Sequence, residues 1–96
     1  MANFEEVDKA RRLLGLGEVA DLKKIKAAYW RLAHRYHPDL CNEDKDTREA
    51  MRELNWAYEL LQDYCRRYKY SFREEAVARA YPDEAYLKWW RENWSV

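Results

Sequence analysis

Glycine and proline are almost absent from this chain, with two residues of each among 96, and residues branched at Cβ are scarce. Strands and the tight turns between them depend on these residue types, so their scarcity argues against a β-rich fold. Alanine, leucine, glutamate, lysine and arginine dominate instead, and they are good helix formers. The composition therefore predicts an all-α fold, and the length predicts a single main domain.

The sequence also lacks a long apolar run, an excess of one charge and a paired cysteine motif. No stretch approaches the roughly 20 apolar residues that span a bilayer, and the N-terminal MANFEEVDKARR has no signal-peptide pattern. Basic and acidic residues balance at 18 each, so net charge favours neither nucleic acid nor membrane as a partner. Cys41 and Cys65 have no CxxC spacing and are predicted to be free thiols in a reducing cytoplasm. We therefore expect a cytoplasmic protein that binds neither nucleic acid nor membrane.

Three helices are predicted from apolar residues that recur at helical spacing. The first covers residues 4–14 and ends at Gly15, and the second begins near Asp21 and ends before Pro38. The third covers about residues 46–64, and its apolar stripe can pack on that of the second helix as an antiparallel hairpin. The two stripes consist of Leu22, Ile25, Tyr29, Leu32, Ala33 and Tyr36, and of Ala50, Met51, Leu54, Ala57, Tyr58, Leu61 and Cys65.

The C-terminal third is rich in aromatic residues, and two further short helices are expected there, one on each side of Pro82. We divide the chain into a domain of residues 1–70 and a helical extension of residues 71–96. The extension carries an apolar stripe at helical spacing. It consists of Tyr86, Trp90 and Trp94, with Leu87 at its edge.

Two large apolar residues of the third helix, Trp56 and Leu60, are predicted to lie on the side away from the hairpin and need cover. We expect the extension to pack on them, because soluble monomers rarely leave so large an aromatic patch exposed. The rival interpretation is that the stripe stays exposed and binds a partner or a client.

The turn after the second helix collects two histidines, a cysteine and several carboxylates. As a metal site it would draw on His34, His37, Asp39 and Cys41, but no second ligand cluster closes a tetrahedral site. As a catalytic pair, His37 and Asp39 are separated by a proline, and no nucleophile or glycine-rich loop accompanies them. We therefore expect no metal, no cofactor and no enzyme.

Basic residues cover the solvent side of the second helix and lead to this turn. By itself His-Pro-Asp is an ordinary turn, and a run of charge is usually a solvated face. Together they form one continuous surface for an acidic partner. The side away from the apolar stripe carries Lys23, Lys24, Trp30, Arg31 and His34, with Lys26 and Arg35 on its flanks.

Three motifs in order give the chain a family resemblance: LLGLG after the first helix, DLKKIKAAYWRLAHRYHPD in the second helix and turn, and MRELNWAYELLQD in the third. From about residue 7 to residue 70 the sequence resembles the J domain, the DnaJ-type co-chaperone module. The resemblance implies a four-helix module that docks on a DnaK-type heat-shock chaperone and stimulates its ATP hydrolysis. Without a Gly/Phe-rich linker, a zinc repeat or a β-rich client-binding region, the chain is similar to the minimal J proteins.

The resemblance also implies roles for residues of this chain. In the family the His-Pro-Asp loop is essential for stimulation, which assigns that role to His37, Pro38 and Asp39. Basic residues of the second helix dock on an acidic surface of the chaperone. The residues expected to contact the partner there are Lys23, Lys24, Lys26, Tyr29, Trp30, Arg31 and Arg35. The nucleotide belongs to the chaperone, so we expect a monomer without a cofactor, and a client protein as a second partner through the extension.

Two positions depart from the family pattern. Trp30 and Leu40 stand where basic residues are usual, which thins the positive surface and favours weaker binding or a dedicated partner. Two alternatives stay open: a J-like adaptor without stimulatory activity, and a helical nucleic-acid-binding domain that uses the second helix. The sequence pI of about 6.7 argues against the second alternative, because such domains usually carry a basic excess.

Overall fold

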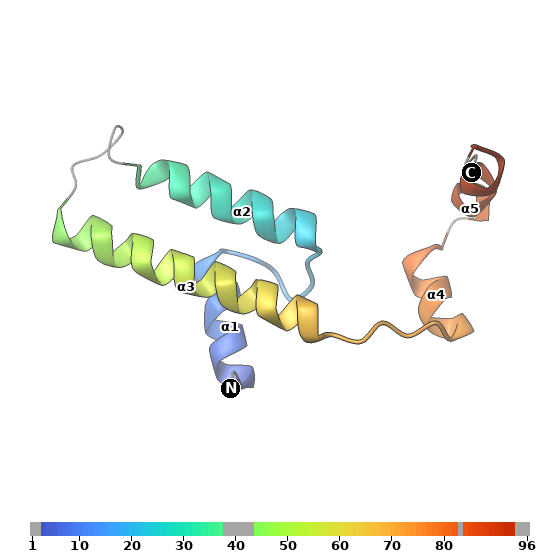
Figure 1. Cartoon of the computed structure of the whole chain (residues 1–96), viewed down its shortest axis with the longest axis horizontal. Helices are drawn as coiled ribbons and strands as arrows, with labels where there is room; N and C mark the ends of the chain where they lie inside the picture. Colours follow the sequence, from blue (N-terminus) through green and yellow to red (C-terminus); the bar gives the residue numbers. More distant parts are fainter. Residues whose placement is uncertain (1–2, 38–43, 83, 94–96) are drawn as a thin grey trace.

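The described part of the chain folds into helices alone. A computed structural model describes residues 3–37, 44–82 and 84–93, without the side chains of residues 84–87. In chain order, these residues form α1 (Phe4–Leu13), α2 (Leu22–Arg35), α3 (Lys45–Arg67), α4 (Glu74–Ala80) and α5 (Glu84–Asn93) (Figure 1). No strand occurs among them, which confirms the predicted all-α fold, and none of these helices is long and apolar enough to cross a membrane.

Capping side chains fix where the first three helices begin. In each case a side-chain oxygen just before the helix accepts a hydrogen bond from the backbone N–H three residues later, which satisfies a donor that the helix leaves unpaired. These bonds join Asn3 to Glu6 at 3.0 Å, Asp21 to Lys24 at 2.8 Å and Asp44 to Thr47 at 2.8 Å. After α1 the chain turns at Gly15, whose φ of 69° is a left-handed conformation that favours glycine.

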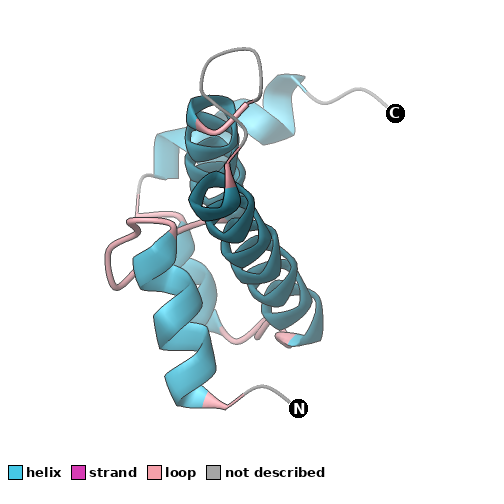
Figure 2. Cartoon of the chain, turned by 90° about the vertical axis from the view of Figure 1, so that its left-hand side faces the viewer, coloured by secondary structure: helices cyan, strands magenta, loops and turns pink. Residues whose placement is uncertain are grey.

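The core lies where α1 and α2 both pack on α3. Figure 1 shows α2 and α3 side by side and antiparallel, and Figure 2 shows α1 as a third helix beside this pair. Seven apolar side chains are buried between the three helices: Ala10, Leu14, Ile25, Ala28, Leu54, Ala57 and Leu61. Full burial of a leucine such as Leu14 stabilises the fold by about 1.5–3 kcal/mol. The predicted hairpin is therefore confirmed.

The stripe of α2 differs from the prediction at two positions. Leu22 is 54 % exposed, because it is the first residue of α2 and lies beyond the buried cluster. Ala28, which the prediction left out, is only 5 % exposed. A small side chain at this position lets the backbone of α2 come close to its neighbours.

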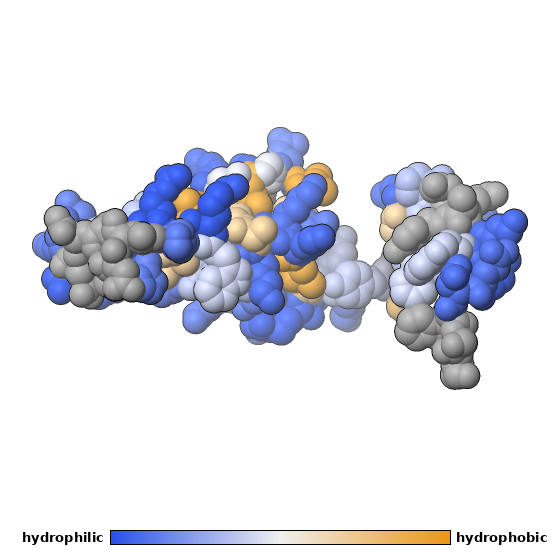
Figure 3. Space-filling model, turned by 90° about the horizontal axis from the view of Figure 1, so that it is seen from above, coloured by the Kyte–Doolittle hydropathy of each residue, from blue (hydrophilic) through white to orange (hydrophobic). Residues whose placement is uncertain are grey.

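The described helices of the extension, α4 and α5, lie apart from the domain. Among the described residues, α4 and α5 contact none of α1, α2 and α3, and Figure 3 shows them as a group set apart from the domain. The radius of gyration is 17.8 Å, whereas a compact chain of 100 residues has about 13 Å. Packing of the extension on Trp56 and Leu60 stays a prediction. Of the expected stripe, the side chains of Tyr86, Leu87 and Trp94 lie outside the described residues.

Trp56 and Leu60, the two side chains expected to need cover, contact α1 and the core. The ammonium group of Lys9 on α1 lies 5.4 Å from the centre of the Trp56 ring, a cation–π contact, and Trp56 remains 36 % exposed. Leu60 is partly buried against the core cluster. The helix that covers the far side of α3 is therefore α1.

Candidate partner-binding surface

Positive charge is concentrated on α2. This helix carries five lysines and arginines and no carboxylate, whereas α1 and α3 each carry equal numbers of acidic and basic residues. The cations of α2 are Lys23, Lys24, Lys26, Arg31 and Arg35, and all five are exposed. Within the described residues none of them forms an ion pair with a carboxylate. A chain with no net charge thus presents one strongly positive helix to solvent.

The packing of α2 on α3 decides which way these cations face. Ile25 and Ala28 are buried against the rest of the core, so residues half a turn away from them point to solvent. Lys23, Trp30 and His34 occupy that outer side, and all three are exposed. The structure therefore leaves the predicted cations of α2 and Trp30 accessible to solvent, whereas Tyr29 is only half-exposed.

Tyr29 is held in place by two contacts with α3. Its ring stacks on Tyr58, with the ring centres 4.1 Å apart and the planes 11° from parallel. Its hydroxyl donates a hydrogen bond to Asn55 Oδ1 at 2.7 Å. The ring of Trp30, which is 60 % exposed, packs against the same ring at a steep angle, with the two ring centres 5.6 Å apart. Tyr29 thus belongs partly to the core and also supports an exposed aromatic side chain beside the cations.

Of the predicted tripeptide, the structure describes the first residue, His37. It follows the end of α2, is exposed, and its backbone N–H donates to the carbonyl of His34 at 3.2 Å. Pro38 and Asp39, together with Leu40, lie outside the described residues. The tripeptide therefore begins at the tip of the hairpin, at the end of the positive helix.

A groove of about 620 Å³ lies between the C-terminal part of α2 and the N-terminal part of α3. Trp30, His34 and His37 line it from the α2 side. On the α3 side it is lined by Arg48 and Arg52, among others, which the sequence reasoning missed. The sequence feature that could have identified them is their spacing of four residues, which places both on one side of α3. They extend positive charge from α2 across the groove.

The start of α3 is fixed electrostatically beside this surface. The Thr47 backbone N–H, bonded to the Asp44 side chain, holds the pKa of that carboxyl below its usual range. Asp44 is therefore ionised at neutral pH, where a negative charge at a helix N-terminus is favourable. This cap fixes the first turn of α3, which carries the groove residue Thr47.

The alternatives of a metal site and a catalytic pair gain no support here. Among residues 3–37, 44–82 and 84–93, no three His, Cys, Asp or Glu side chains are arranged to hold a metal ion. Asp39, which both alternatives would need, and Cys41, which the metal site would need, lie outside these residues. Cys65 is a free thiol on α3.

Comparison with known proteins assigns the family. The sequence model of the DnaJ domain matches residues 9–71, which is most of the chain. The chain belongs to the DnaJ domain family. The match covers the C-terminal half of α1, all of α2 and α3, and the tripeptide, so it includes the whole positive helix.

Named relatives agree with the family assignment. The chain is 47 % identical over 58 residues to a "Chaperone protein DnaJ" from Halothermothrix orenii, a stretch that covers 60 % of this chain and 16 % of that protein. It is 44 % identical over 57 residues to a "Chaperone protein DnaJ" from Rhizobium etli, which covers 59 % of this chain and 15 % of that protein. It is also 50 % identical over 52 residues to a "Curved DNA-binding protein" from Pseudomonas putida, over 54 % of this chain and 16 % of that protein. The chain thus spans about a sixth of the length of these relatives. No solved structure gives a significant match. These matches support a DnaJ-type co-chaperone module.

Proposed function

We propose that this protein docks on a DnaK-type heat-shock chaperone through α2 and stimulates its ATP hydrolysis through His37, Pro38 and Asp39. The observation that carries the proposal is the charge of α2, which has five cations and no carboxylate and ends at the tripeptide of a DnaJ domain. No other helix of the described chain combines these features.

The proposed roles of helix and turn are different. Exposed cations attract an acidic partner and orient it during association, so α2 sets the association rate and the choice of partner. The tripeptide at the tip then contacts the chaperone in a position that favours hydrolysis. The nucleotide and the catalytic groups belong to the chaperone, and this chain contributes a binding surface. That the protein is a monomer of the cytoplasm stays a prediction.

Single-turnover ATP hydrolysis by the DnaK-type chaperone of the same cell tests the proposal. We expect the wild-type protein to accelerate hydrolysis, and His37→Gln and Asp39→Asn each to abolish the acceleration. Because His37 is exposed beyond the packed helices, His37→Gln should leave the helical content and the melting temperature unchanged.

Binding measured in parallel separates this proposal from the adaptor alternative. A wild-type protein that binds the chaperone without accelerating hydrolysis is an adaptor, and the proposed stimulation is then wrong. If the protein neither binds nor accelerates, the docking role of α2 is wrong as well.

A further inference from the structure

Residues 68–73 join α3 to α4 as extended chain, and we call them the aromatic segment. Tyr68, at the end of α3, has φ −72° and ψ 125°, and Arg73, before α4, has φ −69° and ψ 150°. Both pairs of angles are extended. No residue between them belongs to a helix or a strand, and Figure 1 shows the link leading away from the domain. The backbone is therefore extended at both ends of the segment, with angles near those of polyproline II, and no residue of the segment belongs to a sheet.

The backbone of the aromatic segment is open to pairing. The Tyr68 N–H donates to the Cys65 carbonyl at 3.3 Å, and the Arg73 N–H donates to Ser71 Oγ at 3.2 Å. The N–H groups of residues 69–72 have no acceptor in the part of the chain that the structure describes. Exposed backbone N–H groups without a protein acceptor are hydrated in solution. A second extended chain can replace that water with a ladder of hydrogen bonds.

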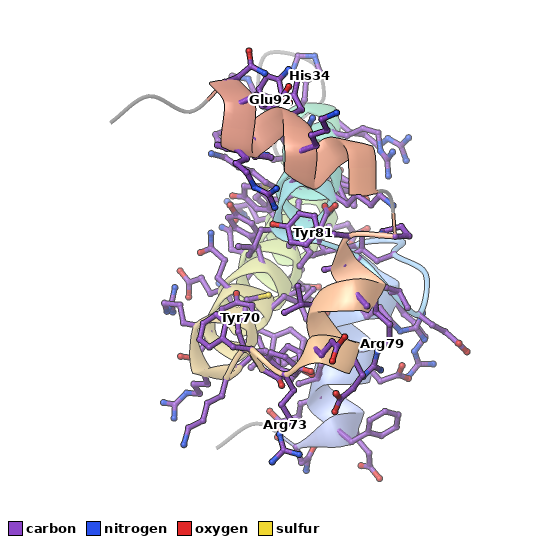
Figure 4. The ribbon with its side chains drawn as sticks, turned by 90° about the vertical axis from the view of Figure 1, so that its right-hand side faces the viewer. His34, Tyr70, Arg73, Arg79, Tyr81 and Glu92 are labelled. Atoms are coloured by element: carbon purple, nitrogen blue, oxygen red, sulfur yellow. The ribbon has the colours of Figure 1, made fainter. Side chains whose placement is uncertain are left out.

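Its side chains alternate as those of a strand do. Tyr68, Tyr70 and Phe72 occupy every second position, and aromatic residues favour strands. The rings of Tyr68 and Tyr70 touch, with centres 6.1 Å apart, so both lie on the same side of the chain. Figure 4 shows Tyr70 and Arg73, which are three positions apart, projecting in different directions. Tyr68 and Tyr70 therefore share one side of the segment, and Arg73 projects in another direction.

The aromatic side chains of the segment are more exposed than is usual for a simple linker between two helices. Tyr68, Tyr70 and Phe72 are 57, 67 and 91 % exposed. Flexible linkers are rich in glycine and serine and stiff ones in proline, but residues 68–73 contain neither glycine nor proline. Contiguous exposed apolar surface marks an interaction site more often than a simple connection.

Charge indicates which partner fits. Lys69 and Arg73 form no ion pair within the described residues. Arg66 and Arg67, just before the segment, share the single carboxylate of Asp63 at 3.6 and 2.8 Å. The next carboxylates after the segment lie in the first turn of α4, where the helix dipole stabilises them. Positive charge is therefore in excess on the α3 side of these aromatic residues, and a partner with carboxylates at that end complements it.

We propose that the aromatic segment binds an extended polypeptide stretch of a partner protein by β-strand addition. Backbone pairing supplies affinity, and the alternating aromatic side chains select apolar side chains on the added strand. Carboxylates at the end of the bound stretch nearest α3 pair with Lys69 and the neighbouring arginines. This site is separate from α2 and does not depend on chaperone docking.

The binding experiment uses the full chain and a defined probe. The probe is a fluorescein-labelled synthetic peptide that alternates valine with threonine and carries glutamates at both ends. A matched peptide carries lysines in place of the glutamates. Fluorescence anisotropy should show binding of the acidic peptide and a Kd at least about tenfold weaker for the basic one. Absence of binding by the acidic peptide overturns the proposal.

Backbone pairing is tested by proline against alanine at the same position. Ser71→Pro and Ser71→Ala both remove the hydroxyl that Arg73 uses, but only proline removes the backbone N–H. Tyr70→Pro and Tyr70→Ala make the same comparison for the opposite edge, since neighbouring N–H groups of a strand point to opposite edges. At one of the two positions, proline should weaken peptide binding about tenfold more than alanine does.

Two further results contradict the inference. Equal binding by the proline and alanine variants at both positions shows that the backbone is not used. Tighter binding of a labelled oligouridylate than of the acidic peptide shows that the exposed rings and cations bind single-stranded nucleic acid instead. Because the segment lies outside the core, circular dichroism should show the same helical content for all four variants.

Discussion

At the scale of single residues, Asp8 joins α1 to the connector that follows it. Its carboxylate accepts hydrogen bonds from Arg11 Nε at 3.0 Å and Nη2 at 2.8 Å and pairs with Arg12 at 3.2 Å. Arg11 in turn donates from Nη1 to the carbonyl of Leu16 at 2.9 Å. The hydrogen bond from Arg11 lowers the pKa of Asp8 below its ordinary value of 3.8.

This lowered pKa predicts how stability depends on pH. A carboxyl group whose pKa is lower in the folded state stabilises that state above its unfolded pKa, and the contribution is lost as pH falls through the folded value. At pH 7 the wild type should therefore melt at a higher temperature than Asp8→Asn, and the difference should shrink below about pH 4. Thermal melts of both proteins between pH 7 and pH 3 test this, and a difference independent of pH contradicts it.

The contact between Lys9 and Trp56 shows what sequence patterns do not contain. Helical spacing correctly placed Trp56 on the side of α3 away from α2. What lies opposite that side depends on how α1 crosses α3, and no spacing within one helix encodes a crossing angle. The extension looked like the natural cover because of its aromatic content. The structure instead places Lys9 of α1 over the ring.

At the scale of helices, most starts and the end of α1 were predictable because their signals are local. Asp21 and Gly15 act through their own side chain and backbone, and the structure has both in the expected roles. The end of α3 was less predictable, since it reaches Arg67 rather than residue 64. Asp63 pairs with both Arg66 and Arg67 and supports the added turn. The groove needed two helices side by side, so Arg48 and Arg52 entered the candidate site only with the structure.

The charge of α2 leads to a prediction for association with the chaperone. Lys26→Glu combined with Arg31→Glu should slow association about tenfold at low salt and change dissociation less, because steering by exposed charge acts before contact. Wild-type association should also slow as salt rises, since salt screens exposed charges. Stopped-flow or biosensor kinetics at several salt concentrations measure both effects.

The matched control keeps the change in net charge and moves its position. Arg79→Glu combined with Arg91→Glu alters the net charge by the same amount, but on α4 and α5. This variant should associate at nearly the wild-type rate. If both double variants slow association equally, net charge rather than the surface of α2 controls the encounter.

At the scale of the whole molecule, a compact domain is followed by two helices, α4 and α5, that contact none of α1, α2 and α3 in the described part of the chain. The domain buries its apolar residues between α1, α2 and α3, and the structure gives α4 and α5 no share in that core. The molecule is accordingly elongated, with dimensions of 53 × 31 × 24 Å. Docking on a chaperone through α2 and binding of an extended polypeptide through residues 68–73 are thus proposed for two separate places on one chain.

Deletion of residues 73–96 tests this division. Because α4 and α5 contact no other helix among the described residues, their removal should change the free energy of unfolding by less than about 0.5 kcal/mol, as for changes on a protein surface. Chemical denaturation of the full and shortened chains measures the difference. X-ray scattering should give the full chain a radius of gyration near 17.8 Å and the shortened chain a smaller one. A large loss of stability on deletion, with a full chain as compact as about 13 Å, would instead establish that the extension packs on the domain in solution.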